Sequence, residues 1–167
     1  MPSTPPNVLN YYIGRGNVYT APVDSSSFTH IGNCPKFSVH PSMEIISHFS
    51  AMASGGRVED DSTLNSKSLT VTINCDEMHG ETVLLGLGAT LVGGTYRVAS
   101  DVIYRAVKFV GSNIKGPKVQ IILNKVQFQV DSDIDFIGTE YMVFPLQGRA
   151  LFYGAVGSES FMDLTFI

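Results

Sequence analysis

The sequence predicts a mainly β fold, a β-sandwich or distorted β-barrel with one short flanking helix. Apolar and polar residues alternate over residues 37–45 and again over residues 68–75, and a period of two is typical of half-buried strands. A similar alternation begins at residue 103, whereas a helical spacing of apolar residues occurs only after residue 76. Because strands dominate this pattern, we expect a β-sheet that buries one face in a shared core.

The N-terminal part of the chain carries weaker signals. The first ten residues include three prolines and predict an extended arm that packs little by itself. Residues 11–20 predict a strand or hairpin interrupted by Gly14 and Gly16, and residues 21–35 are rich in turn formers. At 167 residues the whole chain, 1–167, fits one domain with one hydrophobic core.

Two strands with a long polar segment between them form the centre of the prediction. Their apolar positions are Phe37, Val39, Pro41, Met43 and Ile45 in the first strand and Leu69, Val71, Ile73 and Cys75 in the second. The segment between them, about residues 48–67, is much longer than the usual ~4–6 residues, so we expect a functional loop that assembly orders. The residues expected to make its contacts are His48, Ser50, Gly55, Gly56, Arg57, Glu59, Asp60, Asp61 and Lys67.

A short helix is predicted directly after the second strand. Asp76 can cap it, and Val83, Leu84 and Leu87 are spaced for one apolar face. We expect the helix to run to about Leu85, with residues 86–94 forming a flexible crossing because they are rich in glycine.

The C-terminal half predicts strands again. Alternation over residues 103–110 indicates one strand, and glycine-containing turns separate it from the next. In that next strand Leu123 and Val126 belong to opposite phases of the alternation, which predicts a bulge or turn near Asn124. Residues 141–153 predict one or two further strands, and residues 161–167 predict a terminal strand.

Composition excludes several classes of protein. An apolar content of 44% with 16% charged residues is typical of a folded chain, and a net charge of −4 argues against a basic grip on nucleic acid. The longest weakly charged run, residues 82–96, is too short and too glycine-rich to span a membrane, and we find no signal peptide. Two cysteines, Cys34 and Cys75, favour folding in a reducing cytoplasm, so we expect both to stay thiols and Cys75 to be buried.

The sequence contains no recognisable catalytic site. It lacks a nucleophile elbow, a phosphate-binding loop and a zinc-protease motif. Cys75 and His79 have the spacing of metal ligands, but no second pair accompanies them. Residues 131–135 begin like a calcium loop, yet Phe136 and Met142 occupy the positions that need Gly and Glu. We therefore expect no enzyme activity, no metal and no cofactor.

A group of short motifs carries a resemblance to a known family. These motifs are Gly32-Asn33-x-Pro35, Glu44-x-x-x-His48-x-Ser50, Gly55 or Gly56, Asp60-Asp61, Lys67-Ser68-Leu69-Thr70 and Cys75-Asp76-Glu77. In this order and spacing the chain resembles the major tail tube proteins of long-tailed bacteriophages, which share their fold with type VI secretion tube proteins. The resemblance is closest over residues 31–89, and the rest matches in strand layout. The chain departs from the family in having no immunoglobulin-like decoration domain and little charge around Gly93-Gly94.

The resemblance implies a structural virion protein. Six subunits would form a ring, and rings would stack into a hollow tube that conducts DNA into the host. The expected partners are further copies of the chain and the tail-tip, tape-measure and tail-terminator proteins, with assembly in the bacterial cytoplasm and a final location in the virion tail. The alternative is a host- or glycan-binding β-sandwich module of a phage tail tip or surface, although the sequence has no Trp for a glycan platform.

One acidic segment is a candidate for the wall of the channel. Asp131, Asp133 and Asp135 are spaced to project from one face of an extended strand, and Gln127 and Gln129 continue that face. One interpretation is a solvated strand edge, where aspartates discourage unwanted pairing. The other places this face in the lumen, where carboxylates repel the DNA backbone and let it slide.

Overall fold

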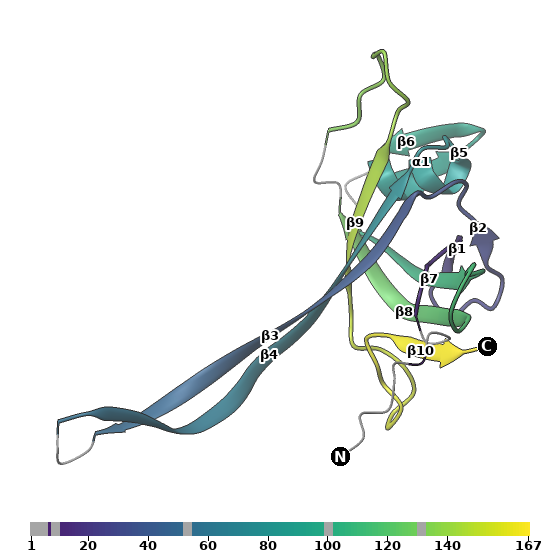
Figure 1. Ribbon diagram of the computed structural model, residues 1–167. Coiled ribbons are helices and arrows are strands. Elements are labelled where there is room, and N and C mark those ends of the chain that lie inside the picture. The colour runs from purple at the N-terminus through teal and green to yellow at the C-terminus, as the bar shows by residue number, and fades with distance from the viewer. Residues whose placement is uncertain (1–6, 8–10, 52–54, 99–101, 130–132) are drawn as a thin grey trace.

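The computed structural model describes residues 7, 11–51, 55–98, 102–129 and 133–167 (Figure 1). Its order of elements is β1 (Gly16–Pro22), β2 (Thr29–His30), β3 (Lys36–Ala51), β4 (Arg57–Cys75), α1 (Gly80–Leu87), β5 (Ala89–Val92), β6 (Thr95–Val98), β7 (Ile103–Gly111), β8 (Val119–Gln129), β9 (Phe144–Ala150) and β10 (Asp163–Phe166). The prediction of a mainly β, sandwich-like fold with one short helix is confirmed.

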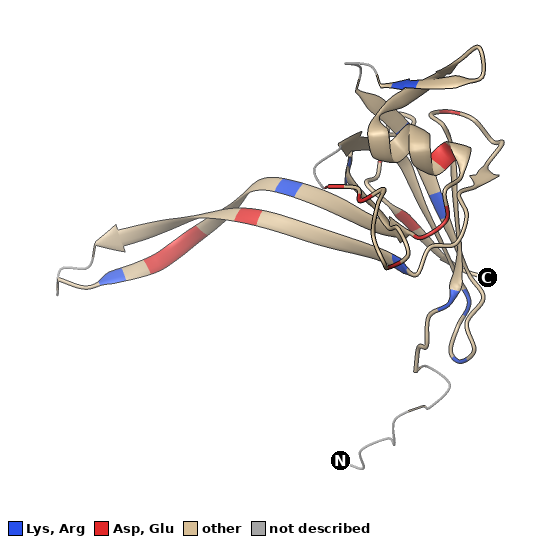
Figure 2. Cartoon of the chain, turned by 90° about the horizontal axis from the view of Figure 1, so that it is seen from above, with Lys and Arg blue, Asp and Glu red and all other residues tan. Residues whose placement is uncertain are grey.

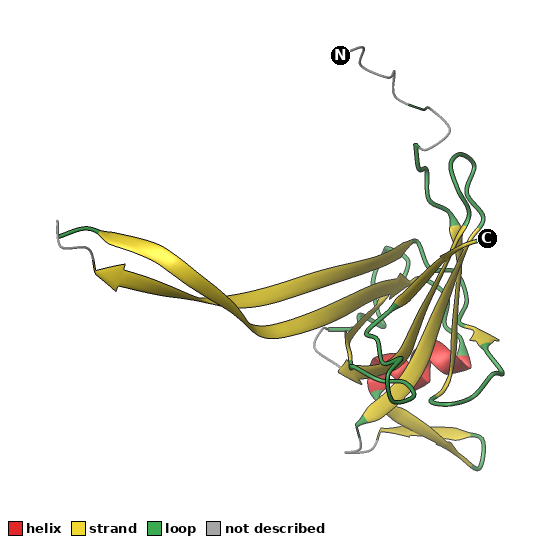
Figure 3. Cartoon of the chain, turned by 90° about the horizontal axis from the view of Figure 1, so that it is seen from below, coloured by secondary structure: helices red, strands yellow, loops and turns green. Residues whose placement is uncertain are grey.

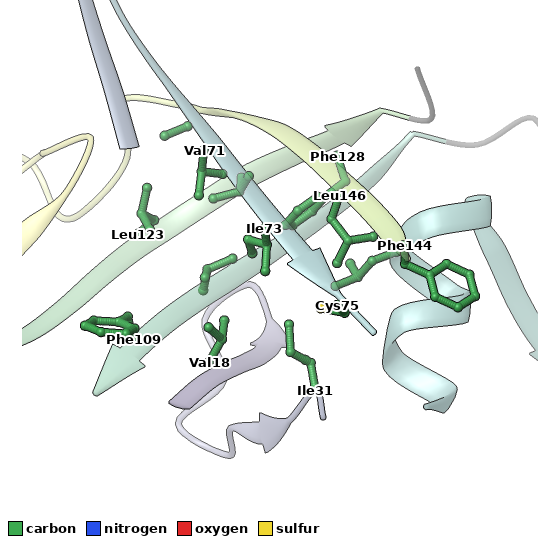
Figure 4. Close-up of a cluster of buried hydrophobic side chains, with 14 of the residues drawn as sticks. Val18, Ile31, Val71, Ile73, Cys75, Phe109, Leu123, Phe128, Phe144 and Leu146 are labelled. Atoms are coloured by element: carbon green, nitrogen blue, oxygen red, sulfur yellow. The ribbon is translucent and has the colours of Figure 1, made fainter. Parts of the chain in front are cut away.

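One large antiparallel sheet forms the body of the molecule. Its strands follow the order β2-β1-β7-β8-β9-β4-β3, and β10 pairs with the free end of β8. The sheet curves strongly, so that β3 lies across the core from β7, and the rings of Phe37 and Phe109 stack with centroids 5.0 Å apart. Figure 4 shows the side chains from β1, β4, β7, β8 and β9 that meet in this core, with Ile31 beside them.

The change of phase predicted in the eighth strand is a β-bulge. Arg105 of β7 pairs with Val126 of β8 and Val107 pairs with Leu123, so two residues of β8, Asn124 and Lys125, stand opposite one residue of β7. This extra residue keeps both Leu123 and Val126 buried in the core. The bulge near Asn124 is therefore confirmed.

The helix begins later than the sequence suggested. His79, not Asp76, is its N-cap: its side chain accepts a hydrogen bond from the Glu81 amide, and Thr82 Oγ1 accepts one from the His79 amide at 2.8 Å. The Asp76 carboxylate instead accepts a hydrogen bond from Asn33 Nδ2 at 2.6 Å. The predicted capping role of Asp76 is wrong, because its side chain is hydrogen-bonded to Asn33 in the turn before β3.

A second hairpin follows α1 where a flexible crossing was expected. β5 and β6 pair with each other, and Gly93 and Gly94 connect them with φ angles of 58° and 81°. Positive φ at both central residues is the requirement of the tightest hairpin turn, which glycine meets without strain. The glycines that suggested flexibility thus form a defined turn.

The two cysteines lie at the base of the β3–β4 hairpin. Cys75 is buried, as predicted, and its Sγ lies 2.8 Å from the Sγ of the half-buried Cys34; both are free thiols in the structure. The hydrogen bond with Cys34 and burial both raise the pKa of the Cys75 thiol above its ordinary value. Cys75 therefore behaves as a small apolar core residue.

Candidate assembly interface

The segment predicted as a long loop is a β-hairpin that leaves the body of the protein. β3 and β4 stay paired from Lys36↔Asn74 out to Ala51↔Arg57, whereas β9 pairs with β4 only between Leu69 and Cys75. Residues 43–51 and 57–67, here called the arm, therefore pair only with each other. Figures 1 and 3 show the arm extending far beyond the sheet. The prediction of a loop over residues 48–67 is wrong.

One face of the arm, here called its apolar face, carries most of the large apolar side chains of the arm, while Ile46 and Val58 lie on the other face. Side chains opposite each other in an antiparallel pair share a face, and alternate residues along β3 do so too. The register places Ile45 opposite Leu64 and Phe49 opposite Glu59, and Met43 lies on the same face two residues before Ile45. Met43 is 62% exposed, Ile45 59% and Leu64 51%. These large apolar side chains are therefore mostly uncovered by the residues that the structure describes.

This apolar face continues the core-facing side of the sheet. On β3 the residues Phe37 and Val39 pack against the core, and Met43, Ile45 and Phe49 follow them in the same alternation. The strands therefore carry a core-like face past the point where the core of this molecule ends. Exposed apolar surface of this kind is typical of sites that contact another protein, a membrane or a ligand.

The arm contains two β-bulges, and the first of them brings Leu64 onto the face of Ile45. Glu44 pairs with Ser66 and Ile45 with Leu64, which leaves Asn65 as an extra residue on β4. A second shift leaves Asp60 as an extra residue between Asp61 and Glu59. Without the first bulge Leu64 would point to the face opposite Ile45, because a slip of one residue reverses every side chain beyond it.

The polar residues predicted for the loop lie along this arm and bond across it. Nδ1 of His48 lies 2.6 Å from Oδ1 of Asp60, and Ser47 donates a hydrogen bond to Glu59 at 2.6 Å. The bonds from His48 and then from Ser50 hold the pKa of Asp60 below its ordinary value of 3.8. Asp61 pairs with His48 in the strand register, and Lys67 pairs with Met43 at the base of the arm.

Gly55, Gly56 and Arg57 lie next to the tip of the arm. Gly55 has a φ of 83°, and an added Cβ at either glycine would meet open space. Arg57 begins β4 and pairs with Ala51. The structure thus brings all nine predicted contact residues onto one projecting hairpin. The extended N-terminal segment predicted for residues 1–10 lies outside the described residues except for Asn7.

The apolar residues of the arm are the functional candidates that sequence reasoning missed. Ile45 was assigned to a strand that ended near it, and Phe49 and Leu64 were assigned to a loop. The alternation of Met43, Ile45, Ser47 and Phe49 along β3 was the available signal. On β4 the two bulges interrupt the period of two and conceal the strand.

The candidate channel residues divide into two groups. Gln127 and Gln129 lie on β8 facing away from the core, while Val126 and Phe128 on the other face are buried, as the alternation predicted. Asp131 lies outside the described residues. β8 ends at Gln129, so Asp133 and Asp135 are exposed residues of the following segment, and their placement on a common strand is wrong.

The two glutamines belong to a wider polar face of the sheet. Two rows of cross-strand neighbours run from β8 across β9 and β4 to β3. The first row is Gln127, Arg149, Thr70 and His40, and the second is Gln129, Gln147, Thr72 and Ser38. Sequence reasoning found two of these eight residues because the others come from strands distant in the chain. The face is polar, and Arg149 is its single Lys, Arg, Asp or Glu in these two rows.

Other kinds of site find little support in the described part of the chain. No group of three or more His, Cys, Asp and Glu residues there could hold a metal ion. No helix there is long and apolar enough to cross a membrane.

A family model matches residues 11–101, which include β1 to β6, the arm and α1. Its description is "Protein of unknown function UCP028589". The chain belongs to this family. That description assigns no activity to the family. No curated protein matches the sequence.

Proposed function

We propose that this UCP028589 protein is the structural subunit of a phage tail tube, which assembles into stacked rings around a DNA channel. The observation that carries the proposal is the arm, whose large apolar side chains are half exposed or more. The resemblance of residues 31–89 to major tail tube proteins gives the class of assembly. The partners would be further copies of the chain and the tail-tip, tape-measure and tail-terminator proteins, in a virion tail assembled in the host cytoplasm.

The isolated arm is poorly stabilised as a free element. A two-stranded ribbon with no core against it is marginal in water, and at least a third strand or a packed surface is needed for independent stability. Contact with another subunit would supply that surface and cover the apolar side chains at the same time. The arm thus has the properties of an assembly element that becomes fully ordered between subunits.

The polar face of the sheet suits the wall of a DNA channel. Ser, Thr, Asn and Gln side chains hold water but carry no charge that grips phosphate, so DNA can pass without specific binding. The two rows through Gln127 and Gln129 have this composition apart from Arg149 and His40. This face replaces the aspartate row as our candidate for the lumen, because it is a surface of the sheet itself.

Electron microscopy of the purified protein tests the proposal directly. We expect the unmodified chain to form rings or tubes, and a variant with Ile45→Ser and Phe49→Ser to stay monomeric with an unchanged circular dichroism spectrum. His40→Ser and Thr70→Ala, on the polar face, form a control pair that should still assemble. Persistent monomers of the unmodified protein at high concentration would contradict the proposal and favour a binding module.

A further inference from the structure

A second exposed surface, at the opposite side of the molecule from the arm, combines apolar and basic residues. Three segments meet there: Ile13 bonds to Lys115 through the backbone at 3.2 Å, the Ser112 amide bonds to Arg15 at 2.7 Å, and the Ile167 amide bonds to Lys118 at 3.0 Å. We call this surface the rim. It carries three cations, Arg15, Lys115 and Lys118.

The rim is also apolar. Ile13, Ile114, Phe166 and Ile167 are each more than half exposed. No acidic side chain occurs in residues 11–18, 111–122 or 164–167, and the ion pairs of the described residues are His48–Asp60 and Arg105–Glu81. The three rim cations therefore have no acidic partner within the described chain.

The arm has the complementary character. Its acidic residues are Glu44, Glu59, Asp60 and Asp61 against the cations Arg57 and Lys67, an excess of two negative charges. The run from Glu59 to Asp61 lies beside Phe49, so acidic and apolar groups adjoin on the arm as basic and apolar groups do on the rim. Figure 2 shows the red segment on the arm and the blue segments around the end marked C.

The two surfaces of one molecule cannot meet each other. Both Figures 1 and 3 show the arm extending away from the end marked C, where Ile167 and the rim lie. A contact between arm and rim must therefore join two molecules and use different surfaces on each. Such a heterologous contact repeats from copy to copy, and it generates a closed ring or an open stack.

We propose that the arm of one copy docks on the rim of a second copy, with the Glu59–Asp61 run facing Lys115 and Lys118. This inference rests on the proposed function and adds the surface that receives the arm. The apolar residues of arm and rim would supply most of the binding energy, and the charges would fix the orientation and exclude other pairings.

A charge exchange tests the contact in the full-length protein. The arm variant carries Glu59→Lys and Asp61→Lys, which leaves the His48–Asp60 bond in place, and the rim variant carries Lys115→Glu and Lys118→Glu. We expect each variant alone to lower the fraction of protein that pellets as rings or tubes by roughly tenfold or more, since like charges then face each other. The variant with all four changes should regain assembly.

Arg97→Glu is the control, because it reverses a charge at an exposed residue of β6 that lies outside the arm, the rim and the polar face. It should assemble normally. Thermal unfolding of each isolated monomer confirms that the substitutions leave the fold intact.

The outcomes separate this inference from the proposed function. If the unmodified protein forms tubes and the rim variant does so equally well, or the four changes together fail to restore assembly, the rim is not the docking surface. A loss of assembly in the control variant would likewise overturn it. If the rim variant assembles but the monomer loses affinity for duplex DNA or for vesicles of anionic lipid, the rim serves a different partner. If the unmodified protein never assembles, the proposed function fails and this inference fails with it.

Discussion

The inner and outer halves of the β3–β4 hairpin use the same backbone pairing but differ in what covers their apolar faces. In the inner half Val71 and Ile73 are completely buried in the core, whereas in the arm Ile45 and Leu64 are more than half exposed. Alternation along a strand therefore indicates pairing and facing, but not burial within the same chain. We propose that a partner molecule covers the apolar face of the arm.

Removal of the arm should have the largest effect, because it should abolish assembly and leave the core of the monomer intact. Ser42 and Ser68 are cross-strand partners, so residues 43–67 can be replaced by an Asn-Gly turn that closes the hairpin at that pair. We expect the shortened protein to keep its core and thermal midpoint and to lose assembly completely. Calorimetry and electron microscopy measure the two effects. An unfolded product would show that the arm contributes to the monomer.

Alanine substitutions in the inner half of the hairpin and in the arm should have opposite consequences. The first should lower the stability of the monomer, and the second should lower assembly. Ile73→Ala removes a completely buried side chain and should lower the free energy of unfolding of the monomer by about 2–5 kcal/mol. Ile45→Ala should change that free energy by only about 0.5 kcal/mol or less, because the side chain is exposed in the monomer.

Assembly should show the opposite order when it is measured on folded protein. Ile45→Ala should raise the concentration at which tubes appear, and denaturant unfolding of the two variants gives the stability comparison. A large loss of monomer stability from Ile45→Ala would mean that the arm packs on its own body.

The polar face of the inner half should affect the cargo and leave assembly unchanged. Gln127→Lys with Gln129→Lys places two cations per subunit on the candidate channel wall, and we expect tubes that retain DNA in a salt-dependent manner. Gln127→Glu with Gln129→Glu is the control of opposite charge and should retain none. Gel retardation of short duplexes by preformed tubes measures this. Equal DNA retention by all three proteins would place this face outside the channel.

The smallest expected effect concerns the acid sensitivity of the arm. The pKa of Asp60 is lower in the folded arm than its ordinary value of 3.8, so its stabilising contribution is complete above that value. The contribution is lost as the pH falls through the lowered pKa, because protonation weakens the bond with His48. The protection of the arm amides, taken relative to the intrinsic exchange rate at each pH, should therefore fall below about pH 4, and Asp60→Asn should abolish that fall. Equal protection at pH 5 and pH 3 would contradict the expectation.

The sequence predicted the inner part of the molecule better than the arm. Alternation identified β7, the inner halves of β3 and β4, and the bulge at Asn124 because these strands bury one face in the core. It failed over residues 57–67, where two extra residues interrupt the period of β4 and acidic residues suggest a loop. The helix start was misplaced because Asn33, distant in sequence, holds Asp76.

The candidate site was predicted only in part, because its faces depend on the pairing of strands that are distant in the chain. The polar contact residues were found from composition, but Met43, Ile45, Phe49 and Leu64 act as one face only once the register is known. The rows through Gln127 and Gln129 need the pairing of four strands, which a single sequence does not contain. The rim likewise combines segments that are distant in the chain, since its backbone hydrogen bonds join residues 102, 97 and 49 positions apart.

The bulge at Asn65 limits how the length of the arm can change in evolution. An arm can gain or lose equal numbers of residues on β3 and β4, and the side chains of the two strands that share a face will still share it. Deletion of Asn65 alone would instead turn Leu64 away from Ile45, together with every residue of β4 between that point and the next irregularity. Relatives of different arm length are therefore expected to differ by equal numbers of residues on β3 and β4, with the unpaired residue kept in its place.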